Sequence, residues 1–189
     1  MKTLKSTLLA LLVISVFSCS KDNDSSNPNN PNNNGESSYS LTLKDTEYSN
    51  SWDSNSETDG QALYSTYVDN SAGNKGLSLN LIDEEKTVAI DAGLTLKNNG
   101  QPFPMSHPSE GWNEDSEFSL VTISVGDKDY VADSGTVTIA NLETKVITGV
   151  TGIAAYDLEI EGSFTNLNDS EDQGVSITAT VHIQPNFNQ

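Results

Sequence analysis

Apolar and polar side chains alternate one by one along much of the chain after residue 39. The alternation is clearest over 87–96, 156–164 and 175–183. A period of two residues is typical of a β-strand that packs one face on a core and turns the other to water. Weaker alternation predicts further strands, over 39–44, 62–68, 77–82, 118–125, 129–132, 135–140 and 145–150.

Turn-forming residues separate these predicted strands, and no segment beyond residue 20 keeps the period of a helix. The stretch VGDKDY predicts a tight hairpin between Val125 and Tyr130. Many short antiparallel strands with one solvated face imply two packed sheets. We therefore predict that residues 39–189 form a single all-β domain, an antiparallel β-sandwich of about 8–10 strands.

The amino terminus has a different pattern, an unbroken apolar run from Leu8 to Phe17 that follows Lys2 and Lys5. The run is too short for a membrane-spanning helix, which needs about 20 residues. Positive residues, a short apolar run and a small residue such as Ser18 are the three parts of a secretory signal peptide. We therefore interpret residues 1–18 as a signal peptide.

The next residue, Cys19, is the only cysteine in the chain. The sequence Val16-Phe17-Ser18-Cys19 resembles the bacterial lipobox. The resemblance implies a diacylglycerol on the cysteine sulfur, cleavage before Cys19, and a third acyl chain on the new amino group. Two or more acyl chains hold a protein stably in a membrane. The alternative is an ordinary signal peptide with an incidental cysteine.

Residues 20–38 contain no apolar side chain and are rich in Asn, Pro and Ser. Such a composition cannot offset the entropy of ordering, so we expect residues 19–38 to be the lipidated cysteine and a disordered tether. The first residues, Ser20-Lys21-Asp22-Asn23-Asp24, resemble the export signal of surface-exposed lipoproteins of Bacteroidota. That resemblance implies an outer-membrane protein exposed at the cell surface, whereas the alternative is simply the start of a polar tether.

The C-terminal strands carry a second resemblance, at Ser134–Ile139, Gly162–Phe164 and Val175–Thr178. These segments are similar to the closing strands of small Bacteroidota lipoproteins of unknown function. The resemblance implies a β-sandwich and brings no catalytic residues with it.

The chain is strongly acidic, with a net charge of −18 and no arginine. Loss of Lys2 and Lys5 with the signal peptide would leave 7 lysines against 27 acidic residues, a net charge near −20. Arginine is the usual clamp for phosphate and carboxylate groups, and a negative field repels nucleic acid and anionic lipid. We therefore expect no nucleic-acid partner.

The sequence offers no catalytic or cofactor motif. Cys19 is expected to be acylated, and neither His107 nor His182 lies in a recognisable triad motif. His182 falls on the polar face of its predicted strand. His107 lies in a proline-rich segment, where a loop hydrogen bond is the simpler role. We therefore expect a protein that is not an enzyme and needs no cofactor.

The abundant acidic turns raise the question of a calcium site. The stretch 53–60 has Asp53, Asn55, Glu57 and Asp59 at alternate positions. An EF-hand loop needs glycine at position six and glutamate at position twelve, where this chain has Thr58 and Tyr64. The turns at 127–133 and 169–172 hold three acids each and could bind calcium weakly. Solvated turns are the simpler interpretation, so we predict no metal site.

Two predicted loops contain the only tryptophans, Trp52 and Trp112. The loop around Trp112 spans 98–116 and also holds Phe103 and His107, and connections longer than about 12–15 residues are usually functional or disordered. An exposed indole among Asn, Asp and Glu can stack on a sugar ring while its neighbours bind hydroxyls. The alternative is that both rings close the ends of the sandwich.

Together these patterns predict a non-catalytic, monomeric surface lipoprotein, anchored in the bacterial outer membrane through Cys19. Its sandwich would serve as an interaction or structural module that meets a protein or a glycan. The first alternative is a lipoprotein that binds a neutral glycan through Trp52 and Trp112, with Phe103 and His107 beside them. An envelope hydrolase is the second alternative.

Overall fold

A computed structural model of the chain describes residues 36–53, 61–69, 75–107, 111–149, 151–169 and 171–184. This part of the chain is all-β, as the alternation predicts, and it contains ten strands. They are β1 (Glu36–Leu43), β2 (Thr46–Asp53), β3 (Gln61–Asp69), β4 (Lys75–Asp83), β5 (Val88–Leu96), β6 (Met105–Ser106), β7 (Leu120–Val125), β8 (Lys128–Thr148), β9 (Thr151–Asn166) and β10 (Val175–Ile183).

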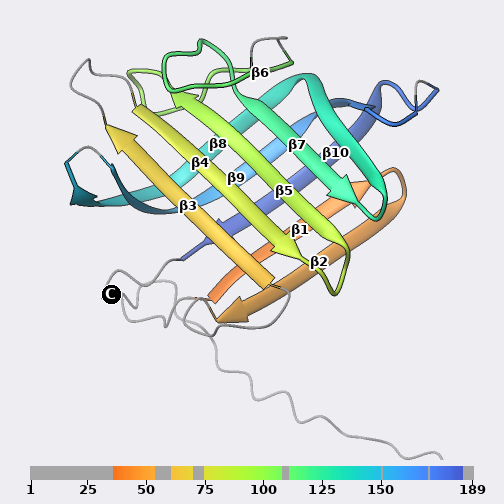
Figure 1. The fold of residues 1–189 in the computed structure, drawn as a ribbon, viewed down its shortest axis with the longest axis horizontal. Helices are drawn as coiled ribbons and strands as arrows, with labels where there is room; N and C mark the ends of the chain where they lie inside the picture. The colour runs from red at the N-terminus through yellow and green to blue at the C-terminus, as the bar shows by residue number, and fades with distance from the viewer. Residues whose placement is uncertain are drawn as a thin grey trace, which may run out of the picture. The chain divides into compact units, whose positions relative to one another are not determined.

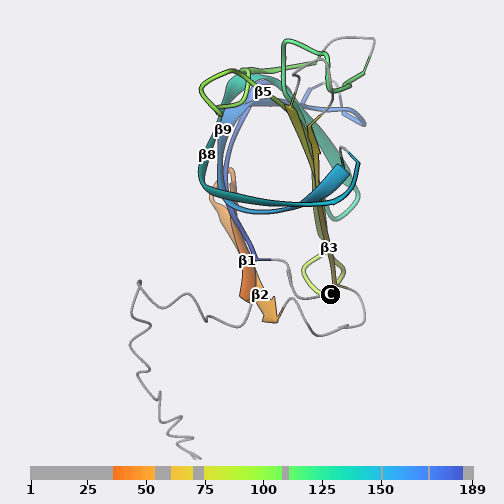
Figure 2. The same cartoon turned by 90° about the vertical axis from the view of Figure 1, so that its left-hand side faces the viewer.

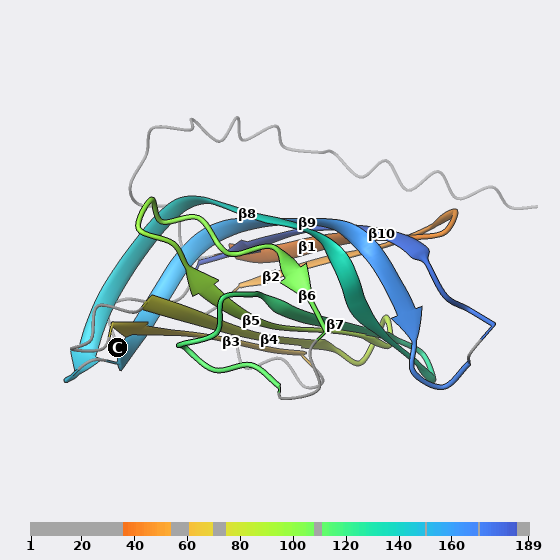
Figure 3. The ribbon, with the colours of Figure 1, turned by 90° about the horizontal axis from the view of Figure 1, so that it is seen from above.

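The strands lie in two layers, as in the predicted sandwich, but hydrogen bonds join all ten of them into one sheet rather than two (Figure 3). One layer contains β2, β1, β10, β9 and β8, and the other contains β3, β4, β5 and β7. Every named pairing between strands is antiparallel. The strands of one layer run across those of the other rather than alongside them (Figure 1).

The long β8–β9 hairpin joins the two layers by hydrogen bonds. The first residues of β9 pair with β3, and the later ones pair with β10 in the other layer. Strand β8 begins beside β7 and then follows β9 along its length. Neighbouring strands therefore close a ring in the order β3-β4-β5-β7-β8-β9, and Figure 2 shows them curving around the core.

The core has the periodicity that the sequence predicts. All five alternate apolar side chains of β5 are buried, and β10 alternates strictly between buried and exposed residues. The predicted hairpin is also confirmed, because Val125 pairs with Lys128 across a two-residue turn. Gly126 takes a φ of 63° in that turn, a left-handed conformation that suits glycine.

Two predicted strands, at 129–132 and 135–140, and the start of a third, predicted at 145–150, belong to one strand, β8, which ends at Thr148. Its pairing with β9 shifts register at three places, the first between Ala132 and Ser134. Such bulges bend a strand and let it pass from one layer toward the other. The bends interrupt the alternation in the sequence without ending the strand, which is why one strand reads as three.

Two predicted loops contain strands. The prediction of a loop over 49–60 is wrong at its start, because β2 continues to Asp53. Within 98–116, the short strand β6 places Met105 in the core against two glycines. A Cβ at Gly135 would clash with the Glu161 carbonyl oxygen, and a Cβ at Gly162 would lie 2.5 Å from the Ser134 carbonyl oxygen, so the backbone needs glycine at both positions.

The described residues begin at Glu36, so the predictions that concern residues 1–35 lie outside them. These are the signal peptide, the acylation of Cys19 and most of the tether over 19–38. The last three tether positions are described and belong to β1, because this strand begins at Glu36 rather than at Tyr39. Among the described residues, no helix has the length and apolar character to cross a membrane.

A buried carboxylate links the two layers at the end of β4. Asp83 has no exposed surface, and its Oδ2 accepts hydrogen bonds from the Tyr39 hydroxyl at 2.8 Å and the Asn50 amide at 2.9 Å. The backbone N–H of Lys86 donates to its Oδ1. Burial and the neighbouring Asp83 carboxylate both raise the pKa of Tyr39. The arrangement ties β1 and β2 to the β4–β5 turn.

Candidate functional site

Trp52 does not have the exposed position expected of a sugar platform. It lies in β2, paired with Ser37 of β1, and only 9% of its surface is exposed. Its ring meets that of Tyr39 edge-on, with 6.3 Å between the centroids. The pleat turns alternate β2 side chains inward, and Trp52 is one of them. The expectation of a platform built from both tryptophans is therefore wrong.

Trp112 lies on the outer face of the other layer. A Cβ at Gly93 of β5 would lie 2.6 Å from the indole Cε3 and 2.8 Å from Cγ. A Cβ at Gly76 of β4 would lie 3.5 Å from the far edge of the same ring. The indole N–H donates a hydrogen bond to the Thr95 hydroxyl at 3.0 Å. The ring is thus held against two glycines, which we call the glycine bed, and it stays partly exposed.

Thr95 brings a second predicted residue, Phe103, close to Trp112. The backbone N–H of Phe103 donates to the Thr95 carbonyl, while the Thr95 hydroxyl accepts from Trp112. The Lys97 ammonium lies 5.4 Å from the centroid of the Phe103 ring. Of the residues predicted for ligand binding, the structure therefore gathers Phe103 and Trp112. His107 is exposed just after β6.

A small hollow of about 240 Å³ is lined by Phe103 and by Thr95, the residue that accepts the Trp112 hydrogen bond, but not by Trp112 itself. Its rim is acidic and polar, and Thr95 belongs to it. The lining residues are Thr95, Leu96, Lys97, Asn98, Phe103, Glu114, Asp115, Ser116 and Glu117. The sequence alone did not identify this place, although a glycine inside the strong β5 alternation, Gly93, is a known signal of close approach by another group.

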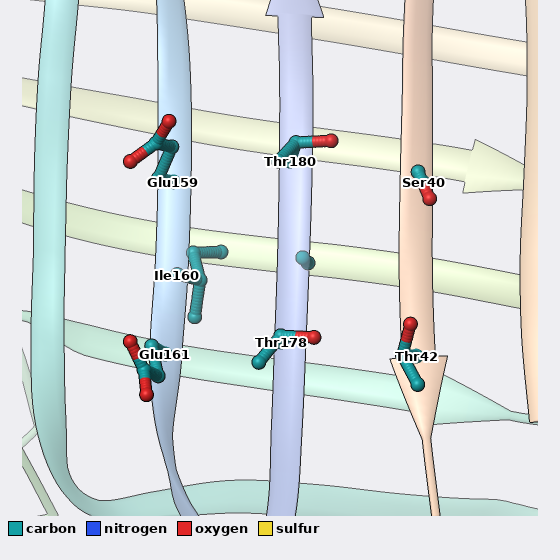
Figure 4. Close-up of a pocket in the computed structure, with 8 residues that line it drawn as sticks. Ser40, Thr42, Glu159, Ile160, Glu161, Thr178 and Thr180 are labelled. Atoms are coloured by element: carbon teal, nitrogen blue, oxygen red, sulfur yellow. The ribbon is translucent and has the colours of Figure 1, made fainter. Parts of the chain in front are cut away.

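The opposite layer presents a regular polar surface. Figure 4 shows Glu159 and Glu161 on β9, Thr178 and Thr180 on β10, and Ser40 and Thr42 on β1, all on one side of the sheet. We call these six residues the hydroxyl face. They form two rows across the strands, because Thr178 lies opposite Glu161 and Thr42, and Thr180 lies opposite Glu159 and Ser40.

Three shallow hollows cover this face and share parts of their lining. The one drawn in Figure 4 has a volume of about 230 Å³. The second shares Thr42 and Thr178 with it, and the third shares Glu161. Pockets that enclose small molecules are deep and mostly apolar. Hydroxyl and carboxylate groups on a broad sheet surface are suited instead to contact with an extended polar partner.

A serine, a histidine and an aspartate lie in one row beside the hydroxyl face. His182 pairs across the strands with Ser38 on one side and Asp157 on the other, and its Nδ1 lies 2.5 Å from the Asp157 Oδ1. Partial burial raises the pKa of Asp157, but hydrogen bonds from His182 and Asn141 outweigh it and lower the pKa.

This row does not have the geometry of a catalytic triad. Among the hydrogen bonds of the described residues, none joins Ser38 to His182. The backbone N–H groups of a central strand such as β10 are committed to its ladders, so they cannot form an oxyanion hole there. Within the described ranges there is also no group of three His, Cys, Asp or Glu residues placed to hold a metal ion.

Comparisons with protein-family models, with curated proteins and with solved structures return no match to this chain. The site must therefore be interpreted from its own geometry.

Proposed function

We propose that this protein is a lipid-anchored envelope protein whose β-sandwich is a non-catalytic interaction module. The observation that carries the proposal is the position of Cys19, directly after a signal-like apolar run. The described fold starts at Glu36, so a polar segment without apolar side chains separates the expected anchor from the first strand. The SKDND stretch supports a place at the surface of the bacterial outer membrane.

The hydroxyl face supports the interaction part of the proposal. Its Ser and Thr hydroxyls can both donate and accept hydrogen bonds, and Glu159 and Glu161 accept them. The excess of acidic residues opposes contact with nucleic acid and other polyanions. We therefore propose a neutral or cationic partner for this module, which acts as a monomer.

Metabolic labelling with a clickable fatty acid tests the anchor. The wild-type protein should be labelled and should sediment with the outer membrane, whereas Cys19→Ala should lose both properties. Ser18→Ala is the matched control, because it keeps a small residue before the cysteine and should stay labelled. Labelling of Cys19→Ala at the wild-type level, or an unlabelled wild-type protein, would contradict the proposal.

Protease treatment of intact cells tests surface exposure. The proposal predicts that the β-sandwich becomes accessible to antibody and protease without breaking the outer membrane. Changing Asp22 and Asp24 to Ala should keep the lipid but remove this accessibility. If that double variant stays at the surface, the SKDND stretch is not an export signal.

A neutral glycan as ligand is the second candidate function, now without Trp52. The glycine bed under Trp112 is the observation that favours it.

A further inference from the structure

The position of Trp112 lowers the stability of the strand beneath its ring. Simple closure of the loop would not require that position. The ring lies over backbone on β4 and β5, and this requires glycine at Gly93, whereas a Cβ at Gly76 would meet the ring at an ordinary contact distance of 3.5 Å. Glycine weakens a strand interior, because it loses more entropy on folding and packs no side chain. The two glycines and the Thr95 hydrogen bond fix the orientation of the indole before any ligand arrives.

The fixed orientation of the indole leaves one face of the Trp112 ring for contact with a ligand. One face of the indole lies on the glycine bed, and its N–H is used by Thr95. The opposite face points away from the sheet, in agreement with the partial exposure of the residue. A flat apolar ring face without a free polar group binds by stacking.

The surroundings define what can stack there. Glu114 adjoins the ring, since its Cβ and the indole Cη2 each lie 3.5 Å from the Cβ position of Gly76. Glu114, Asp115 and Glu117 line the neighbouring hollow. Carboxylates accept hydrogen bonds from hydroxyl groups and repel anions. Lys97 is occupied with Phe103, so Phe103 does not offer a second open ring on that side.

We propose that the outer face of Trp112 stacks on one sugar ring of a neutral glycan, whose hydroxyls donate hydrogen bonds to the carboxylates of the adjoining hollow. This site rests on the proposed interaction function and adds a second binding surface to it, on the layer opposite the hydroxyl face.

A glycan array probed with the full, lipidated protein in detergent tests the site. The array carries neutral oligosaccharides and uronic-acid oligosaccharides. The wild-type protein should bind at least one neutral glycan and none of the acidic ones. Titration with the best neutral oligosaccharide should then give an affinity about tenfold weaker for Trp112→Ala. Thr95→Val, which frees the indole N–H, should weaken binding less, and Trp112→Phe should retain part of the affinity.

The controls distinguish loss of the Trp112 site from misfolding and from failure of the proposed anchored module. Circular dichroism verifies the fold of each variant, and Thr95→Val serves as the readout if Trp112→Ala does not fold. Changing Thr178 and Thr180 on the hydroxyl face to Ala should leave glycan affinity unchanged. The proposal is overturned if the wild-type protein binds no neutral glycan. It is also overturned if the Trp112 and Thr95 variants bind the glycan with the same affinity as the wild type. Either result leaves the fatty-acid labelling of Cys19 as an independent test of the anchored interaction module.

Discussion

The two tryptophans occupy opposite kinds of environment in one sandwich. Trp52 points inward from β2 and belongs to the core, where it meets the ring of Tyr39. Trp112 belongs to no strand and lies on the outer surface of β4 and β5, over Gly76 and Gly93. Both lie in polar stretches of sequence that predict loops, so composition alone does not separate them.

The difference shows that the neighbouring strand, and not the local sequence, decides the role of each ring. Trp52 is buried because β1 pairs with β2 along its whole length and fixes the pleat. Trp112 is held outside because β5 has no Cβ at Gly93, where the ring lies, and because its indole N–H donates to the Thr95 hydroxyl. One ring should therefore matter chiefly for stability, and the other chiefly for binding.

Truncation of the two rings should give the largest contrast. Trp52→Ala removes a large buried side chain and should lower the free energy of unfolding by about 3–5 kcal/mol. Trp112→Ala should cost only about 1–2 kcal/mol, because its ring is partly exposed and loses a single hydrogen bond. Urea unfolding measures both. Equal losses would show that the two rings do not differ in role.

Removal of the Asp83 carboxylate, which accepts a hydrogen bond from Tyr39, should destabilise the part of the core around Trp52. Asp83→Ala leaves the Tyr39 hydroxyl, the Asn50 amide and the Lys86 N–H without their acceptor. We expect a loss of about 3 kcal/mol, since each unsatisfied buried group costs roughly 1–3 kcal/mol. The control is Asp91→Ala. Asp91 is an exposed carboxylate on β5 that accepts a hydrogen bond from Asn80, so its removal should lower the stability only slightly. A similar loss in both variants would contradict this assignment.

A methyl group placed under Trp112 should displace its ring. Gly93→Ala puts a Cβ within 2.6 Å of the indole Cε3, and overpacking of this kind costs about 1–3 kcal/mol. The double variant Gly93→Ala with Trp112→Ala should recover most of that loss, because the clash needs both groups. Urea unfolding of the four proteins in this cycle measures the coupling. Additive losses would mean that the ring does not lie on Gly93.

The sequence predicts the strands better than it predicts the site. Residues of β10 alternate between core and solvent over its full length, and the apolar residues of β5 are buried at every second position, so their pattern identifies both strands directly. Strand β2 has Ser, Asn or Glu at four of its eight positions, and its place in the sheet depends on pairing with β1, which a local pattern does not contain. The glycine bed likewise depends on two strands that become neighbours only in the fold.

The smallest expected effect concerns acid stability at the turn after β9. Hydrogen bonds from Lys44, opposed by partial burial and aided by Tyr130, lower the pKa of Asp172 to about 2. A lowered pKa in the folded state adds stability that is present above the ordinary value near 4 and disappears as the pH falls through about 2. In a plot of stability against pH, Asp172→Asn should therefore show a smaller fall over this range of pH.

Urea midpoints measured between pH 6 and about pH 2 determine that profile. The wild-type midpoint should fall more than that of Asp172→Asn over this interval. Parallel profiles for the two proteins would show that Asp172 does not contribute in this way. Neither tryptophan should affect this difference, because the side chain of Asp172 contacts Lys44, Lys128, Tyr130 and Asn166.

Fluorescence of the two single-tryptophan proteins tests the division of roles most directly. Trp52→Phe leaves Trp112 as the only indole, and Trp112→Phe leaves Trp52. We predict that acrylamide quenches Trp112 strongly and Trp52 weakly, and that the neutral oligosaccharide chosen on the array changes only the Trp112 emission. Equal quenching of the two proteins, or a response to the oligosaccharide when Trp52 is the only tryptophan, would contradict the account.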